Sequence, residues 1–452
     1  LRPRGARRRP LRQRPAGRRR RPSTLRDVSS FYLTTPIYYV NARPHLGHAY
    51  TTIAADIAAR HMRQRGADVF FLTGTDEHGA KVAAAAAAEG LTPKAFCDRV
   101  SGVFRDLARD VNATNDFFIR TSDPEHEAFV QAFVERMRAA GDVYEGTYSG
   151  LYCTGCEAFY TEDDLSEGLC PQHGTRPSFV EEKNWFFRLS AYAERLLALF
   201  EGPDDFVLPA TRANEARAFI EGGLEDISLS RASIEWGIPV PWEPEQVIYV
   251  WIDALINYAS ALTYARPGDD LTARYWPPRW QLLAKDILKF HAVIWPAMLM
   301  SAGYEVPRGL MIHGYLTVRD RKMGKSVGNV LDPFRVIQAY GLDALRFYLF
   351  RDVRFGGDGE VGYDRVHERY TTELANDLGN LVSRSTAMVE RYRDGAVPDA
   401  PTDPAIAAVL ETARERFAAH VDRLELTDAI DASWTAVREL NRFVEEQAPW
   451  RL

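Results

Sequence analysis

The sequence predicts an α/β fold in which an insertion interrupts a parallel sheet and a helical bundle follows it. Strand-like and helix-like segments alternate over residues 31–115, which is typical of a parallel sheet with helices between its strands. Short aromatic runs around a cluster of cysteine and histidine residues then break this alternation. From about Val366 to Trp450, apolar residues recur at helical spacing, which predicts the bundle.

The first half of the sheet is expected to begin at Phe31–Val40, a run rich in β-branched and aromatic residues. A helix from about His48 to Arg65 and a second strand, Val69–Leu72, should follow, and then an alanine-rich helix, Lys81–Glu89. The second strand ends at a polar cluster, Thr73–Gly79. Parallel sheets of the Rossmann type bind ligands at the carboxyl ends of their strands, so this cluster is expected to lie at a site.

The second half of the sheet is expected to resume at Val247–Trp251 and to continue with Gln281–Ala284. A helix over Ile287–Met300 should be kinked at Pro296, and Leu310–His313 should lead towards a lysine-containing loop. We therefore expect six parts: an Arg-rich head (1–30), the first half of the Rossmann domain (31–115), an insertion (116–240), the second half (241–320), a lysine-loop region (321–365) and a helical domain (366–452).

The insertion carries a metal-binding pattern, Cys153-x-x-Cys156 followed by Cys170-x-x-His173. Two such pairs supply four ligands for tetrahedral zinc. Because all four ligands come from the protein, the site is predicted to be closed and structural, and to replace a core that so small a subdomain cannot build. The fourth cysteine, Cys97, stands alone and is expected to be a buried structural thiol.

Composition and charge narrow the class of protein. The 452 residues are 46% hydrophobic and 12% aromatic, which indicates several well-packed globular domains. No apolar run reaches the roughly 18 residues of a membrane span, so no membrane partner is expected. Residues 1–30 contain 12 Arg and one acidic residue, a net charge of +11, whereas the remainder carries −17. Any RNA contact must therefore use local basic patches.

The Arg-rich head has no core pattern and is expected to be disordered. It is similar in composition to an organelle transit peptide, which predicts a mitochondrial and/or chloroplast location. A nonspecific RNA-binding arm and a mistranslated leader, with a cytoplasmic protein behind it, are the alternatives.

Two motifs together indicate attack on the α-phosphate of ATP. The first, His45-Leu46-Gly47-His48, offers two imidazoles that can hold phosphate oxygens around a glycine on which an adenine can lie. The second, Lys322-Met323-Gly324-Lys325-Ser326, offers two lysines that can neutralise charge on a leaving pyrophosphate. Each motif alone is weak, and the first also fits an ordinary turn into a helix; the pair in this order is specific.

Two further groups of residues have two interpretations each. Asp76 can bind an ammonium group or cap a helix. The aromatic stretch Trp251–Tyr258 with Phe290, His291 and Trp295 can be plain core or a pocket for a flexible, polarizable side chain.

A row of polar residues in the predicted bundle also has two interpretations. Asn376, Asn380 and Arg384 recur at a spacing of four, and Trp450 lies near the end of the bundle. Amides and aromatic rings recognise unpaired bases, but a solvated helix face and a core tryptophan fit the same pattern.

With these motifs, the chain resembles the class I aminoacyl-tRNA synthetases, and within them the methionyl-tRNA synthetase family, over about residues 31–452. Its single knuckle is similar to the bacterial and organellar branch. The segments that carry the resemblance are Thr34–Asn41 leading into His45–His48, Thr73–Gly79, the zinc knuckle, Asp226–Arg231, Tyr249–Tyr258, Lys285–Trp295 and Lys322–Asn329. The family's bundle usually continues further, so the terminal helix is expected to be cut.

The resemblance implies that methionine and ATP, with Mg²⁺, form methionyl-adenylate and that the methionyl group passes to elongator and initiator methionine tRNA. The catalytic residues it implies are His45, His48, Lys322 and Lys325, and those for ATP add Gly47, Asp286 and Ser326. It assigns methionine binding to Ile37, Tyr39, Asp76, Arg231, Trp251, Ala254, Leu255, Tyr258, His291 and Trp295. It assigns the anticodon to Asn380, Arg384 and Trp450, which makes 366–452 an anticodon-binding domain, and it favours a monomer.

Apolar contacts alone distinguish methionine from leucine by roughly 1–3 kcal/mol. We therefore expect Tyr39 or His291 to make a polar contact with the sulfur. The alternatives to this function are a class I synthetase for another amino acid and a catalytically silent, tRNA-binding relative. Against the first, four protein ligands leave the zinc no open position, and about 120 inserted residues leave no room for a large editing domain. Against the second, both histidines and both lysines of the motifs are present.

Overall fold

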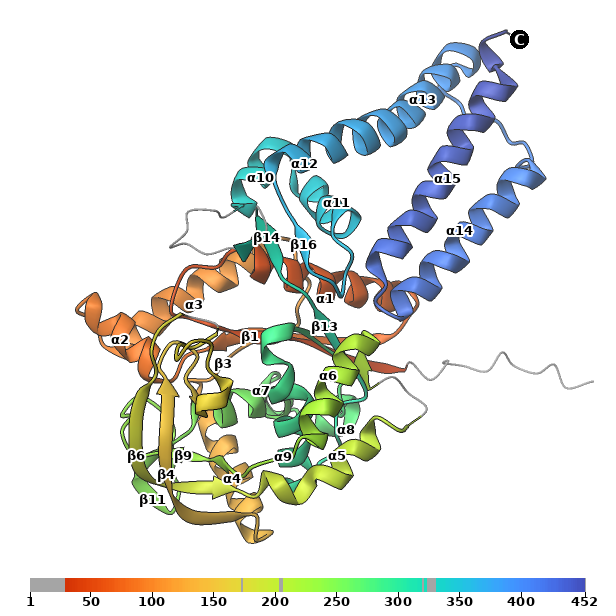
Figure 1. The fold of residues 1–452 in the computed structure, drawn as a ribbon. Helices are drawn as coiled ribbons and strands as arrows, with labels where there is room; N and C mark the ends of the chain where they lie inside the picture. The colour runs from red at the N-terminus through yellow and green to blue at the C-terminus, as the bar shows by residue number, and fades with distance from the viewer. Residues whose placement is uncertain (1–28, 172–173, 203–205, 319–320, 323–330, 452) are drawn as a thin grey trace, which may run out of the picture.

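The computed structural model describes residues 29–171, 174–202, 206–318, 321–322 and 331–451 (Figure 1). Within these residues, the central sheet has six strands in the order β3-β2-β1-β12-β13-β7, all parallel to their neighbours. The strands are β1 (Ser30–Tyr39), β2 (Asp68–Asp76), β3 (Phe117–Arg120), β7 (Val207–Leu208), β12 (Trp280–Ala284) and β13 (Leu310–His313). This is the predicted α/β architecture.

The first half of the sheet forms as its sequence predicts, with shifted ends. Helix α1 (Leu46–Gln64) begins two residues before His48, because His45 caps it and His48 already lies in its first turn. Strand β2 runs four residues beyond Leu72, so most of the polar cluster lies inside the strand. Helices α2 (Ala80–Ala88) and α3 (Pro93–Asp110) follow.

The predicted boundary at 115/116 is wrong, because the parallel sheet continues past it. Strand β3 pairs with β2 in parallel, and helix α4 (Pro124–Ala139) then packs beneath the sheet, where Phe133 stacks on Trp295 with ring centroids 6.0 Å apart. Two of the four residues of β3 are aromatic, so the strand resembles the short strands of the insertion, which explains the error. The edge strand β7 also belongs to this sheet, although it lies within 116–240.

The insertion proper is a long antiparallel hairpin of β4 (Val143–Cys153) and β6 (Ser178–Phe187), which projects below the sheet in Figure 1. In the described part of the insertion, β5 (Ala158–Tyr160) and β8 (Ile227–Ser228) complete the order β5-β4-β6-β8. Helices α5 (Ala193–Leu199) and α6 (Ala210–Glu221) lie between β6 and β8 in the chain.

The strand expected at Val247–Trp251 does not resume the parallel sheet. Strand β11 (Glu243–Ile248) is the middle strand of a small antiparallel sheet with β9 (Ser230–Arg231) and β10 (Pro239–Val240). Helix α7 (Val250–Tyr264) begins inside the predicted strand and crosses to the parallel sheet. An apolar run of this length fits a buried strand and a buried helix equally well. The short helix α8 (Thr272–Tyr275) leads on to β12.

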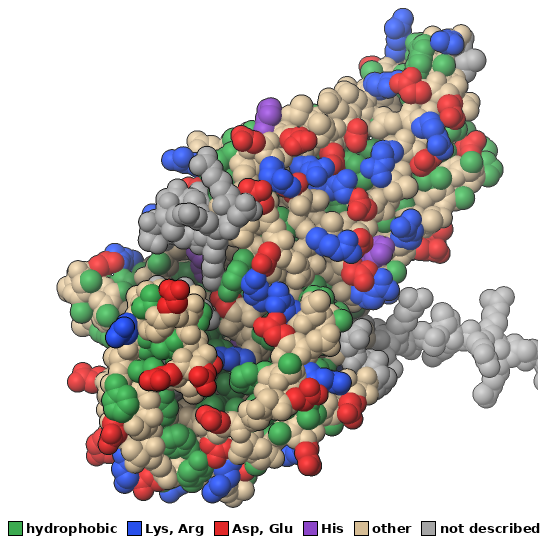
Figure 2. Space-filling view, in the orientation of Figure 1, with side chains coloured by type: hydrophobic (Ala, Val, Ile, Leu, Met, Phe, Trp, Pro, Cys, Tyr) green, Lys and Arg blue, Asp and Glu red, His purple; other side chains and the backbone are tan. Residues whose placement is uncertain are grey.

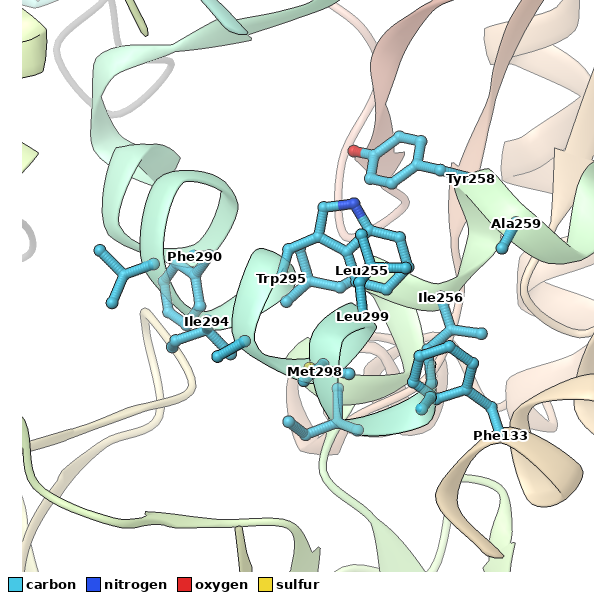
Figure 3. Packing of buried hydrophobic residues seen from close by; sticks show 14 of the residues in the cluster. Phe133, Leu255, Ile256, Tyr258, Ala259, Phe290, Ile294, Trp295, Met298 and Leu299 are labelled. Carbon is cyan, nitrogen blue, oxygen red and sulfur yellow. The ribbon is translucent and has the colours of Figure 1, made fainter. Parts of the chain in front are cut away.

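The segment after β12 is not one kinked helix. A 3₁₀ turn (Lys285–Ile287) and a π-helical turn (Phe290–Ile294) precede α9 (Trp295–Ala302), and Pro296 lies in the first turn of α9. Proline is well tolerated in a first turn, so the irregularity lies before it and not at it. Phe290 of the π turn and Trp295 of α9 both belong to the hydrophobic core, part of which Figure 3 shows.

Beyond the sheet, β14 (Leu316–Val318), β15 (Arg321–Lys322) and β16 (Gly359–Glu360) form a small sheet beside α10 (Pro333–Tyr340), α11 (Leu342–Asp352) and α12 (Tyr363–Arg369). A π-helical stretch, Tyr370–Gly379, continues into α13 (Asn380–Arg393), and α14 (Pro404–Asp422) packs along α15 (Leu426–Gln447). These last helices form the predicted bundle, which extends away from the sheet in Figure 1. Among the described helices, none combines the length and the apolar character needed to cross a membrane.

Candidate active site

A cleft of about 400 Å³ opens at the carboxyl ends of β1, β2, β12 and β13. Most of the residues predicted for ATP and methionine that the structure describes line this one cavity. They are Ile37, Tyr39, His45, Gly47, His48, Asp76, Trp251, Ala254, Leu255, Tyr258, Asp286 and His291. The cavity lies where a parallel sheet binds its ligands, so topology explains its place.

The first motif forms the start of α1. The Nδ1 atom of His45 accepts a hydrogen bond from the Gly47 backbone N–H, and the Nδ1 atom of His48 accepts one from the His45 backbone N–H, each at 3.0 Å. A neutral imidazole that accepts at Nδ1 carries its proton on Nε2, so both rings present an Nε2–H donor. The two ring centroids lie 4.0 Å apart.

Gly47 is required by this arrangement. A Cβ atom at this position would lie 2.9 Å from Cε1 of His45, closer than side-chain atoms pack. The glycine therefore lets the His45 ring fold back over the helix N-terminus, where the helix dipole favours anions. The motif as built can bind phosphate.

Asp76 lies at the end of β2, opposite Tyr39 of β1 in the strand register. Its side chain is only 6% exposed, and among the described residues its Oδ1 atom has no hydrogen-bond partner. Burial raises the pKa of Asp76 well above its usual value, and the nearby carboxylates of Asp253, Glu157 and Glu77 raise it further. A buried carboxyl group in such a field is poised to bind a cation.

The acidic neighbours of Asp76 are already neutralised by other partners. Glu77 forms a bidentate pair with Arg120, at 2.7 and 2.8 Å. Asp253 is bound by His78 and His126, each at 2.7 Å, and these contacts lower the pKa of Asp253 despite its burial. The third neighbour, Glu157, accepts hydrogen bonds with both carboxylate oxygens, from the Tyr39 hydroxyl and the Lys81 backbone N–H, whereas Oδ1 of Asp76 is left for a ligand.

Apolar and aromatic side chains form the wall beside Asp76. Trp251 stacks on Phe290 with ring centroids 3.9 Å apart. The hydroxyl of Tyr258 lies 2.8 Å from Nε2 of His291, whose Nδ1 lies 3.0 Å from the Ile287 carbonyl oxygen. Burial lowers the pKa of His291 to about 4, so the ring is neutral at physiological pH. With Nδ1 donating to the carbonyl, Nε2 accepts from Tyr258.

The two side chains expected to contact a substrate sulfur, Tyr39 and His291, direct their protons to acceptors of the protein. The Tyr39 hydroxyl donates to Oε2 of Glu157 at 2.8 Å, and the His291 N–H is directed to a backbone carbonyl. Neither side chain therefore offers its proton to the cavity. What the wall offers is an apolar, aromatic surface of a kind that suits a thioether.

Trp295 and Arg231 are not among the residues that line the cavity. Trp295 is fully buried behind Tyr258, with ring centroids 6.1 Å apart, and packs on Phe133 (Figure 3). His291 and Trp295 both lie against the Tyr258 ring, with centroids 5.6 and 6.1 Å from it, so they share a face as predicted, but only His291 lines the cavity. Arg231 is buried, paired with Glu182 and stacked over the Tyr152 ring at 4.1 Å.

Several residues that line the cavity were not predicted from the sequence. They are Thr51, Lys81, Glu157, Tyr160, Lys289, His313 and Tyr315. Glu157 directly follows a zinc ligand, and that position was the one signal available in the sequence. The ammonium of Lys285, next to Asp286 in the chain, lies 4.5 Å from the centroid of the Tyr315 ring. It also forms a salt bridge with Asp358 at 2.6 Å. These contacts join segments that are far apart in the sequence, so spacing does not reveal them.

The thiols of Cys153, Cys156 and Cys170 converge as a metal site requires. Their Sγ atoms all lie within 4.8 Å of one another, and those of Cys156 and Cys170 are 3.4 Å apart. Such spacing fits three corners of a tetrahedron around zinc, with Zn–S bonds of about 2.3 Å. The fourth predicted ligand, His173, lies outside the described residues. The isolated Cys97 is buried on α3, as expected.

Removing one zinc ligand should destabilise the protein. Zinc binding supplies folding free energy to small metal-bound subdomains, so Cys170→Ser is expected to lower both the zinc content and the melting temperature. Metal analysis and calorimetry measure these two quantities. Cys97→Ser, which changes a buried thiol away from the cluster, is the matched control and should keep the metal. Full zinc occupancy in Cys170→Ser would contradict the assignment.

The second motif is described only in part. Lys322 lies in β15, and its backbone pairs with Thr317 of β14. Lys325 and Ser326 lie outside the described residues, as does Gly324. The roles predicted for these residues stay predictions.

In the bundle, the structure brings together two of the three residues predicted for the anticodon. The guanidinium of Arg384 lies 5.3 Å from the centroid of the Trp450 ring and also pairs with Glu445 at 2.6 Å. Trp450 is 41% exposed, so it is not a core residue. Asn376, in the π-helical stretch, and Asn380, at the start of α13, are both exposed.

Comparisons with known proteins agree with this geometry. A family model described as tRNA synthetases class I (M) matches residues 31–177 and 162–386. The chain is 46% identical to Methionine--tRNA ligase of Thermotoga maritima over 433 residues, which are 93% of this chain and 68% of that protein. It is also 46% identical to the enzyme of the same name from Mesorhizobium japonicum, with 93% and 83% covered.

A solved structure extends this similarity to the fold. Mycobacterium tuberculosis methionyl-tRNA synthetase in complex with methionyl-adenylate superposes with a TM-score of 0.89 at 45% identity. The match covers 93% of this chain and 84% of that one.

Proposed function

Because this chain belongs to the methionyl-tRNA synthetases, a family of class I aminoacyl-tRNA synthetases, we propose that its cleft holds methionine at Asp76 and ATP at His45 and His48. The enzyme activates L-methionine with ATP and charges tRNA with it, and it carries a structural zinc site. The relatives' activity and the methionyl-adenylate bound to a solved relative support this function over a synthetase for another amino acid or a silent paralogue.

The observation that supports the substrate assignment best is the buried Oδ1 atom of Asp76 at the head of an apolar pocket. An amino acid with an unbranched apolar side chain satisfies both features, because its ammonium pairs with Asp76 and its side chain enters the aromatic wall. Trp251, Tyr258 and His291 would surround that side chain, with Ile37, Ala254 and Leu255 completing the wall. This supports a role for these residues in methionine binding.

The protein itself forms no covalent bond with the substrates in this reaction, because the methionine carboxylate is the nucleophile. An oxygen of the methionine carboxylate attacks the α-phosphorus of ATP, a new O–P bond forms, and the bond to pyrophosphate breaks. The Nε2–H groups of His45 and His48 would hold the charged phosphate oxygens, while Lys322 and Lys325 would neutralise the leaving pyrophosphate. Asp286, which interacts with Tyr315 at the cavity edge, would contact the nucleotide near its ribose. Mg²⁺ accompanies ATP and shields its phosphates.

The second half of the reaction transfers the methionyl group to the 3′ end of tRNA. We propose that Asn380, Arg384 and Trp450 contact the anticodon of both elongator and initiator methionine tRNA. Support comes from the stacking of Arg384 on the exposed Trp450 ring, a platform for an unpaired base. Basic and acidic side chains are interspersed over the bundle in Figure 2, so we expect local contacts there, not a broad basic surface.

Aminoacylation tests the whole reaction. The holoenzyme should charge a methionine tRNA transcript with a CAU anticodon and should charge it much less when that anticodon is replaced. Trp450→Ala should lower kcat/KM for the tRNA and leave ATP–pyrophosphate exchange unchanged. Equal charging of both transcripts would contradict anticodon recognition.

Two further proposals concern the setting in which the enzyme works. We propose that it acts as a monomer, as the family resemblance favours. We propose a mitochondrial and/or chloroplast location from the Arg-rich composition of residues 1–30. A fluorescent fusion that carries these 30 residues tests the second proposal, and sedimentation of the holoenzyme tests the first.

Methionine affinity should depend on pH through Asp76. Its raised pKa means that a protonated fraction persists above the usual pH range for an aspartate, and only the ionised form binds an ammonium. The KM for methionine should therefore fall as pH rises over the range in which Asp76 ionises and the methionine ammonium stays protonated. Exchange kinetics across a pH series measure this, with the KM for ATP as the internal control. A methionine KM that rises over the same range would contradict the role.

A further inference from the structure

The turn that carries two zinc ligands also forms part of the cleft. Gly155, Cys156 and Glu157 all line the cavity, although they belong to the insertion and not to the parallel sheet. Glu157 has a positive φ of 47° and a side chain that is only 3% exposed. A non-glycine residue in this conformation, with a buried carboxylate, is held by its surroundings.

The Glu157 carboxylate connects two elements of the parallel sheet domain. Its Oε2 atom accepts a hydrogen bond from the Tyr39 hydroxyl at 2.8 Å, at the end of β1. Its Oε1 atom accepts one from the Lys81 backbone N–H at 2.8 Å, in the first turn of α2. In the described structure, Gly79 gives α2 no side-chain cap of its own, so Glu157 supplies the cap from a distant segment.

The Glu157 side chain lies close to the backbone of Gly79, just before α2. A Cβ atom at Gly79, which has a φ of +105°, would lie 2.5 Å from Oε2 of Glu157. The segment Asp76–Gly79 leads directly from the ammonium site into this contact. The position of the Glu157 carboxylate thus bears on Tyr39 and on the chain that carries Asp76.

The backbone of the same turn accepts further hydrogen bonds from side chains around the cleft. The Nε1–H group of Trp251 donates to the Cys156 carbonyl oxygen at 3.3 Å, and the Tyr249 hydroxyl donates to that of Glu157 at 2.5 Å. The Lys81 ammonium donates to the Gly155 carbonyl oxygen at 2.9 Å. A turn that zinc holds rigid would therefore set the position of the pocket wall.

We propose that Glu157 is a positioning residue for methionine, which ties the zinc turn to Tyr39 and to the N-terminus of α2. The inference rests on the proposed methionine pocket. It assigns Glu157 no contact with the reacting atoms and no role in binding ATP. Its loss should therefore weaken methionine binding selectively, because the pocket loses its shape while the phosphate site at α1 is unchanged.

The test compares Glu157→Ala and Glu157→Gln with the wild-type holoenzyme in ATP–pyrophosphate exchange. Glu157→Ala should raise the KM for methionine about ten- to a hundredfold, the usual consequence of unpairing buried hydrogen-bonding groups, while kcat and the KM for ATP stay within about twofold. Glu157→Gln retains one acceptor oxygen and should show a smaller rise. Glu162→Gln, at an exposed glutamate of the same loop, is the matched control.

A double-mutant cycle separates positioning from general damage. If Glu157 acts through the Tyr39 hydroxyl, Tyr39→Phe should also raise the methionine KM, and the double variant should be no worse than Glu157→Ala. Zinc content measured in each variant should remain at the wild-type level. If Glu157→Ala loses zinc, Glu157→Gln decides the proposal, since it keeps the size of the side chain and one acceptor oxygen.

The outcomes distinguish this inference from the function on which it rests. Wild-type exchange that does not respond to methionine would contradict the proposed function itself. A responsive wild type with an unchanged methionine KM in Glu157→Ala, or in Glu157→Gln where Glu157→Ala has lost zinc, would overturn the role of Glu157 alone. Additive effects in the double variant would overturn it as well.

Discussion

Asp76→Asn is expected to raise the KM for methionine by roughly 30- to 5000-fold, which is the range for truncating one partner of a buried charge pair, about 2–5 kcal/mol. The substitution keeps the shape of the side chain but removes the charge that the substrate ammonium needs. The acidic field of the cavity remains around an amide that cannot neutralise the cation. Steady-state ATP–pyrophosphate exchange at varied methionine concentration measures the effect.

The control for Asp76→Asn is a carboxylate on the surface of the same domain. Asp106→Asn, at an exposed position on α3, should leave the KM for methionine unchanged. The KM for ATP should be nearly unaffected in both variants, because the phosphate site at His45 and His48 is built from the start of α1. An Asp76→Asn enzyme with normal methionine affinity would show that another group binds the ammonium.

Lys325→Ala should lower kcat for adenylate formation by about 10²- to 10³-fold, as is found when one group that stabilises a charged transition state is removed. Its ammonium is expected to neutralise the charge that develops on the pyrophosphate as the P–O bond breaks. Methionine binding does not use this charge, so the methionine KM and equilibrium methionine binding should change little. Rapid-quench measurement of methionyl-adenylate gives the chemical step directly.

An exposed lysine provides the comparison for this variant. Lys94→Ala on α3 removes an ammonium that pairs with Asp98 at the surface and should retain wild-type kcat. A Lys325→Ala enzyme that forms adenylate at the wild-type rate would exclude a role for this lysine in the transition state. A loss confined to methionine affinity would assign it to substrate binding instead.

Local chemistry made the phosphate site and the ammonium site predictable from the sequence. The histidine motif works through contacts within four residues, since His45 and His48 cap the helix that they begin. Asp76 follows a buried strand, and the carboxyl end of such a strand is a ligand site in any sheet of this type. The three cysteines converge because their spacing suits two short turns.

Contacts between segments that are distant in the chain could not be predicted from the sequence. Trp295 was assigned to the pocket because helical spacing places it on the face of His291, but its ring is fully buried in the core and does not line the cavity. Arg231 pairs with Glu182 across two strands of the insertion, and no local pattern indicates such a partner. Glu157 reaches the cleft from the zinc turn by tertiary packing alone. Local periodicity carries no information on these pairings.

The predicted domain boundaries differ from the structure for the same reason, because tertiary pairing decides them. Strand β3 is short and aromatic, and only its pairing with β2 assigns it to the parallel sheet. The run Val247–Trp251 contains the end of one strand and the start of a helix, which apolar content alone does not distinguish. The elements from β1 to α2 were predicted in type and order, because their hydrophobic patterns are long enough to decide between strand and helix.

The most direct test of the central claim is ATP–pyrophosphate exchange with the full chain and each of the twenty amino acids in turn. An ammonium site at Asp76 beside an apolar, aromatic wall predicts that methionine drives exchange best, with leucine and isoleucine weaker and charged amino acids inactive. Exchange driven best by another amino acid would contradict the substrate assignment. Absence of exchange with every amino acid would contradict the adenylation activity itself.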